Sequence, residues 1–98
     1  MKKTFKLTHE KLNKDRLVDA IKHEVKKYIK RERKRTLPEG TDYWDFDCRF
    51  GADLGISDVI HLSEINKSID GAVEDELESF YLEIMARAAT RNKTTDED

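Results

Sequence analysis

An amphipathic segment at residues 14–35 limits the folds open to this chain, because a helix with one apolar face needs a surface to bury it. Apolar side chains recur there at helical spacing and fall within about 120° of one face. They are Leu17, Val18, Ile21, Val25, Tyr28 and Ile29. Asn13 is a suitable N-cap, and the Leu37-Pro38 pair ends the helix because a residue before proline avoids the helical region. The opposite face is basic, so this helix lies at the surface.

Segments of alternating polarity supply the surface that the helix needs. Such alternation is typical of half-buried strands, and it is strictest where Trp44, Phe46, Cys48 and Phe50 share one side. Four strands are predicted, at residues 3–8, 44–50, 58–62 and 79–86. A second helix is predicted from Ser63 as its N-cap to about residue 74, because Glu64 in the first turn suits the helix dipole.

The predicted order is strand, helix, strand, strand, helix, strand. This is the order of the ferredoxin-like split βαβ fold (βαββαβ), an α+β architecture with an antiparallel sheet and two helices on one face. If residues 58–62 are helical instead, the sheet has three strands and the second helix is longer. The length favours a single α+β domain, which we place at residues 1–87, followed by a disordered polar tail at 88–98.

The charges are divided unevenly along the chain. Residues 1–36 hold 14 basic and 5 acidic side chains, whereas residues 37–98 hold 5 basic and 16 acidic ones, although the formal net charge is only −2. Cys48 is the single cysteine, which excludes a disulfide framework. The chain has no apolar run long enough for a membrane span and no signal peptide, so a cytoplasmic protein is expected.

The basic face of the first helix is the main candidate for a functional surface. Its cations are able to follow a phosphate backbone, and basic runs of this kind are common in nucleic-acid-binding proteins. The candidate nucleic-acid-binding residues are Lys26, Lys27, Lys30, Arg31, Arg33, Lys34 and Arg35. A merely solvated face is the plainer interpretation, since cations also suit the C-terminal end of a helix.

An acidic cluster at the end of the second helix bears on this choice. If both crossovers are right-handed and the helices run in the same direction, their C-terminal ends meet. In that arrangement the carboxylates would weaken the attraction of the basic helix for a polyanion. The residues concerned are Glu74, Asp75, Glu76 and Glu78.

The open face of the predicted sheet is the alternative candidate. It lacks the aromatic and basic side chains of an RNA-recognition sheet, and its carboxylates repel phosphate. Tyr43, Tyr81 and Met85 are instead expected to form a small patch for protein interaction or homodimerisation. The expected partner is therefore a nucleic acid or a protein, and the expected state is a monomer or a weak homodimer.

Catalytic and metal sites are not favoured by the sequence. Cys48 points inward on its strand and is interpreted as a small core residue. A Cys48–His61 pair has no support from the local sequence, and the acidic residues 42, 45 and 47 lack the spacing of a calcium loop. We therefore predict a binding module without catalytic residues, cofactor or bound metal.

Four segments resemble a family of small uncharacterised bacterial proteins of unknown function. They lie at residues 3–8, 44–51, 61–67 and 78–84. The resemblance covers about residues 3–87. It implies a bacterial cytoplasmic protein, and it carries no activity, cofactor or site residue over to this chain.

Overall fold

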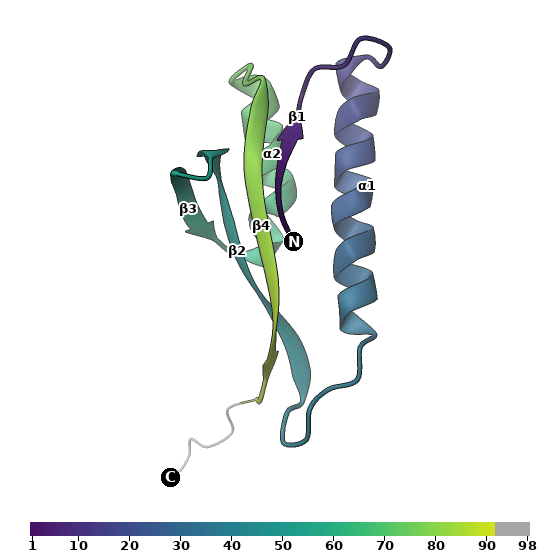
Figure 1. The fold of residues 1–98 in the computed structure, drawn as a ribbon, viewed down its shortest axis with the longest axis vertical. Helices are drawn as coiled ribbons and strands as arrows, with labels where there is room; N and C mark the ends of the chain where they lie inside the picture. The colour runs from purple at the N-terminus through teal and green to yellow at the C-terminus, as the bar shows by residue number, and fades with distance from the viewer. Residues whose placement is uncertain (92–98) are drawn as a thin grey trace.

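The computed structural model describes residues 1–91 of the 98-residue chain. The elements follow the predicted order (Figure 1). They are β1 (Lys2–Lys6), α1 (Lys14–Arg33), β2 (Tyr43–Asp53), β3 (Ile56–Ile60), the 3-10 helix η1 (Leu62–Glu64), α2 (Ile65–Glu74) and β4 (Ser79–Ala89). None of the helices in this part of the chain is long and apolar enough to cross a membrane.

The four strands form one antiparallel sheet in the order β1-β4-β2-β3. The α1 connection passes from β1 across β4 to β2, and the α2 connection passes from β3 across β2 to β4. Each helix therefore joins two parallel strands that have a third strand between them. This confirms, at a coarse level, the predicted ferredoxin-like split βαβ fold with its four-stranded antiparallel sheet and two helices. Because β3 pairs with β2, the alternative with a three-stranded sheet is wrong.

One apolar layer holds both helices against the same face of the sheet. The inward side chains of β2 and β4 alternate as predicted, and Cys48, Leu82 and Ile84 are at most 1% exposed. The helices contribute Val18, Ile21 and Val25 from α1 and Ile65, Ile69 and Ala72 from α2. All of these residues belong to a single buried cluster. Burial of this stripe is the main reason that α1 is stable as a helix.

The two helices run in opposite directions, which corrects the expectation that their C-terminal ends meet. In Figure 1, α1 descends while α2 rises, and Lys22 in the first half of α1 pairs with Asp70 in the second half of α2, with an N–O distance of 2.6 Å. The reason lies in the sheet, because each crossover helix runs antiparallel to the strands it joins, and those two strand pairs are antiparallel to each other.

The acidic cluster therefore lies at the far end of α1 from its basic residues. The backbone N–H of Leu7 donates to the carbonyl oxygen of Glu78 at 2.8 Å, which places the end of this cluster next to the loop that leads into α1. The acidic cluster consists of Glu74, Asp75, Glu76 and Glu78. They do not neutralise the basic C-terminal half of α1.

The boundaries of all four strands differ from the predicted ones. β1 occupies Lys2–Lys6 instead of residues 3–8, and β2 occupies Tyr43–Asp53 instead of residues 44–50. β3 occupies Ile56–Ile60 instead of residues 58–62, because β2 continues to Asp53 through a bulge and the chain turns back at once. β4 continues to Ala89, so the strand ends beyond the predicted domain boundary. The remainder of the predicted tail, residues 92–98, lies outside the described residues.

The helix caps agree with the sequence at one helix and differ at the other. The Oδ1 of Asn13 accepts a hydrogen bond from the N–H of Arg16 at 2.9 Å, as predicted for this cap. At the second helical segment, His61 replaces the predicted Ser63 as N-cap. Its Nδ1 accepts from the N–H of Ser63 at 3.2 Å, and the Glu64 carboxylate accepts from the N–H of His61 at 2.9 Å. A histidine ring nitrogen thus takes the place of the usual cap oxygen.

Candidate nucleic-acid interface

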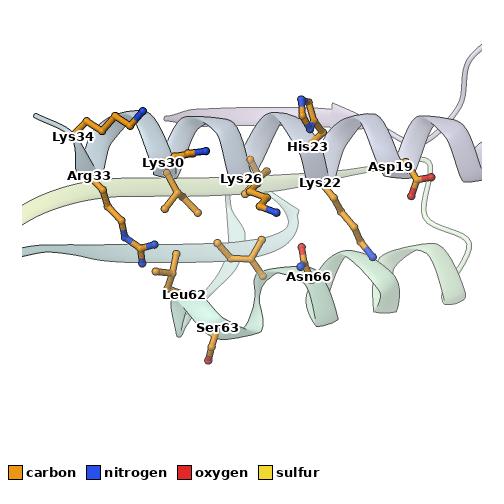
Figure 2. A pocket seen from close by; sticks show the side chains of 13 residues that line it. Asp19, Lys22, His23, Lys26, Lys30, Arg33, Lys34, Leu62, Ser63 and Asn66 are labelled. Atoms are coloured by element: carbon orange, nitrogen blue, oxygen red, sulfur yellow. The ribbon is translucent and has the colours of Figure 1, made fainter.

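A groove of about 930 Å³ lies between α1 and the start of the second helical segment. Figure 2 shows side chains of α1 facing η1 and the first turn of α2 across it. The apolar part of the lining comes from Val25, Ile29, Leu62 and Ile65. The cationic part comes from Lys22, Lys26, Lys30, Arg33 and Lys34, with His23, Asp19, Ser63 and Asn66 as the remaining polar residues. The groove is therefore a basic surface with an apolar base.

Helical spacing brings four of the seven predicted cations to this groove, and we call Lys26, Lys30, Arg33 and Lys34 the groove cations. Three of them follow one another at intervals of four residues, which places them on one side of the helix. Figure 2 shows Lys26 and Arg33 directed toward the second helical segment. The guanidinium carbon of Arg33 also lies 5.5 Å from the centre of the Phe46 ring, and this contact orients the side chain.

The other three predicted cations lie elsewhere. Lys27 and Arg31 line a separate hollow of about 200 Å³ on the neighbouring side of α1. Arg35 follows the helix and is held locally, because it lies 4.8 Å from the Trp44 ring centre and forms an ion pair with Glu32 at 2.6 Å. The predicted set is therefore divided between two sides of the helix and one locally paired residue.

The groove cations are not paired with the carboxylates that the structure describes. Within residues 1–91 none of the four forms a salt bridge. Lys22 differs, because it lies toward the acidic end and is paired with Asp70. The positive charge is thus concentrated in the C-terminal half of α1.

Sequence reasoning missed one side of the groove. Lys22 and His23 lie on the basic face of α1 that the helical period predicts, but they were not among the predicted binding residues. Ser63 and Asn66 come from the second helical segment. No local motif marks these two residues, and only the antiparallel direction of the helices brings them opposite the basic end of α1.

The open sheet face does not carry the predicted aromatic patch. Tyr81 is only 5% exposed, and its hydroxyl donates to the Glu83 carboxylate at 2.8 Å, so the expectation of an exposed Tyr81 is wrong. Its neighbours across the strands are Thr4 and Gly51. Tyr43 lies at the start of β2, far along the strand from Gly51, and the Arg91 guanidinium is 5.4 Å from its ring centre. Met85 is exposed at 42%.

Ion pairs occupy the open face between these positions. Arg87 on β4 lies 3.0 Å from the Asp45 carboxylate and 2.9 Å from the Asp47 carboxylate on β2. The hydrogen bond from Arg87 lowers the pKa of Asp47, because it stabilises the ionised carboxylate. The centre of the open face therefore carries paired charges, and Met85 is an isolated apolar side chain among them.

The Cys48–His61 pair that the sequence left without support is not formed. Ile60 lies opposite Cys48, and His61 follows the strand as the cap of η1. Cys48 is 1% exposed, which confirms its interpretation as a core residue. Within residues 1–91, no group of three or more histidine, cysteine or acidic side chains is arranged to hold a metal ion.

The buried thiol leads to a prediction about alkaline pH. Burial, with a smaller contribution from Asp47 and Asp45, raises the pKa of Cys48 from 9.0 to about 11. The unfolded thiol ionises first, so its contribution to stability is complete below about pH 9 and is lost between about pH 9 and 11. We expect the difference in unfolding free energy between the wild type and Cys48→Ala to fall over this interval in denaturant titrations.

The reactivity of the same thiol provides an independent check. The native protein at about pH 8 is expected to react with a thiol-specific disulfide reagent only after unfolding, because the thiolate is the reactive form and the side chain is buried. Rapid labelling without denaturant, or a free-energy difference that stays constant from about pH 9 to 11, would contradict this assignment.

Comparison with known proteins identifies the family of the chain. A model described as a family of unknown function, DUF6172, matches residues 1–95. No curated protein and no solved structure matches the chain. Since the match extends over nearly the whole sequence, the chain belongs to this family of unknown function, DUF6172.

Proposed function

We propose that the protein binds nucleic acid through the groove cations and the neighbouring basic residues of α1. The observation that carries this proposal is that four adjacent cations line one groove without a salt-bridge partner in residues 1–91. A phosphate backbone presents regularly spaced negative charges, which suits cations repeated along a helix. Each contact releases counterions from the nucleic acid, so binding should strengthen as the salt concentration falls.

The distribution of charge along the molecule supports this proposal. The acidic residues at 74–78 lie at one end of α1 and the groove cations lie at the other, so the groove is basic although the formal net charge is −2. The first turn of α2 also lines the groove. Its dipole adds partial positive charge on that side. A bacterial cytoplasmic location is part of this proposal, since nucleic acid is present there.

The expected mode of binding is contact with the phosphate backbone rather than with the bases. Among the described residues that line the groove there is no Phe, Tyr or Trp on which a base could stack. The open sheet face is unsuited as well, since Asp45 and Asp47 repel phosphate. Little preference for nucleotide sequence should therefore be seen.

Reversing two charges in the groove tests the proposal. Lys30→Glu combined with Lys34→Glu is expected to weaken binding of labelled RNA or DNA of about 20 nucleotides by at least about tenfold at low salt. The slope of log affinity against log salt should also become smaller by about 1.4–1.8, because two phosphate contacts are lost. Fluorescence anisotropy between about 50 and 200 mM salt measures both quantities.

A matched control distinguishes the loss of groove cations from a change in net charge alone. Lys11→Glu combined with Lys67→Glu makes the same change in net charge at two exposed positions outside the groove. This control is expected to keep most of the affinity. The proposal fails if the wild type does not bind at low salt, or if the two double variants weaken binding equally.

A further inference from the structure

We propose that β3 is a docking edge for an extended segment of a partner protein that carries a basic residue between apolar ones. β3 is the last strand of the sheet, and in residues 1–91 it pairs with β2 alone (Figure 1). The free side of an edge strand presents backbone N–H and C=O groups that can hydrogen-bond an added strand. The proposal concerns a different surface from the groove.

The hairpin that ends in β3 exposes an unusual amount of apolar surface. Leu54, Ile56 and Val59 are 68%, 69% and 74% exposed. They are three of the five large apolar side chains that are exposed within residues 1–91. A cluster of this kind on an open edge favours contact with another chain.

The two edges of the sheet differ in how they are protected. The β1 edge carries the exposed lysines at residues 2, 3 and 6, and Lys3 is tied to Glu24 of α1 at 2.7 Å. Lysine side chains on an edge strand oppose pairing with a second strand. β3 has neither lysine nor arginine nor proline in its five residues Ile56–Ile60. Pairing is therefore opposed at one edge and open at the other.

The register of β3 defines the chemistry of the partner. Asp58 lies opposite Phe50, so it points to the helix side of the sheet together with Ile56 and Ile60, whereas Val59 points to the open side. Asp58 is exposed and forms no salt bridge within residues 1–91. A complementary partner is an antiparallel strand that places lysine or arginine opposite Asp58. Apolar residues on both sides of that basic residue would cover the apolar side chains of β3.

A second copy of the chain is a poorer fit for the same edge. The symmetric pairing that overlaps the two strands completely sets Ile56 opposite Ile60 of the second copy. It therefore sets the two Asp58 carboxylates directly opposite each other, and like charges at such positions destabilise a sheet. The carboxylate thus selects a basic partner over self-association.

A designed peptide tests the proposed edge. The probe is acetyl-Thr-Val-Val-Lys-Thr-Val-Thr-amide, which sets its lysine opposite Asp58 in an antiparallel pair. Titration into the ¹⁵N-labelled full chain is expected to shift the backbone amide signals of β3. A peptide with Glu in place of Lys should bind about three- to fivefold more weakly, the effect of one cross-strand charge pair.

Two protein variants make the result decisive. Asp58→Lys should reverse the preference, so that the Glu peptide binds more tightly than the Lys peptide. Val59→Lys should remove binding while leaving the circular dichroism spectrum unchanged, because the side chain is 74% exposed. The proposal is overturned if β3 signals do not move, if both peptides bind alike to both proteins, or if sedimentation shows self-association that Val59→Lys abolishes.

Discussion

Phe80→Ala is expected to lower the free energy of unfolding by about 3–5 kcal/mol, the usual cost of removing a buried aromatic ring. Phe80 on β4 is 0% exposed and lies at the centre of an aromatic stack. Its ring centre is 5.4 Å from that of Phe5 on β1 and 4.9 Å from that of Phe50 on β2. The cavity would open between three strands of one sheet, so the neighbouring side chains can close it only partly. Urea denaturation followed by circular dichroism measures the change.

The total stability of a domain is only about 5–15 kcal/mol, so this variant approaches the limit of folding. Phe80→Leu provides a milder test in which most of the apolar volume is kept, and it should lose clearly less than the alanine variant. Met85→Ala on the same strand is the control, because Met85 is 42% exposed on the other face. A loss for Phe80→Ala as small as that for Met85→Ala would show that the stack does not support the core.

Hydrophobic periodicity was sufficient for the order of elements. Residues 44–50 and 79–86 alternate because one face of each strand is buried under the helices, and residues 14–33 show the helical period because one stripe packs on that face. The ends of β3 were less predictable, since its position depends on the bulge in β2 and on the turn at Leu54-Gly55. A bulge adds one residue to a strand, and the hydrophobic pattern does not show its position.

The sequence predicts only part of the candidate interface, because the rest depends on the tertiary arrangement of the helices. A basic run on one helix is visible in the sequence, and Lys26, Lys30, Arg33 and Lys34 do lie together. Which carboxylates lie near them depends on the direction of a second helix, and that direction follows from strand pairing. The same holds for Tyr81, which is only 5% exposed although alternation places it on the open face of the sheet. Alternation predicts the face of a residue, but exposure also depends on the size of its neighbours.

Gly51→Ala is expected to destabilise the protein by about 3 kcal/mol, because the added methyl group meets backbone atoms that cannot move aside. A Cβ at this position would overlap the carbonyl oxygen of Ile56 and lie 2.5 Å from the Cα of Ser57. Gly51 is the residue at which the register between β2 and β3 shifts. The substitution should therefore separate β3 from β2 locally before the whole domain unfolds.

Gly71→Ala is the matched comparison, since apart from its chain neighbours and the backbone of its own helix no atom lies within 4 Å of the added methyl group, and the residue is inside α2. Replacing a glycine in a helix interior should stabilise the protein by about 0.5–1 kcal/mol. Denaturant titration measures both variants, and hydrogen exchange of the β3 amides shows where the loss in Gly51→Ala occurs. If Gly51→Ala leaves both stability and β3 protection unchanged, the close approach of the two strands at Gly51 is wrong, and with it the placement of β3 as the edge of the sheet.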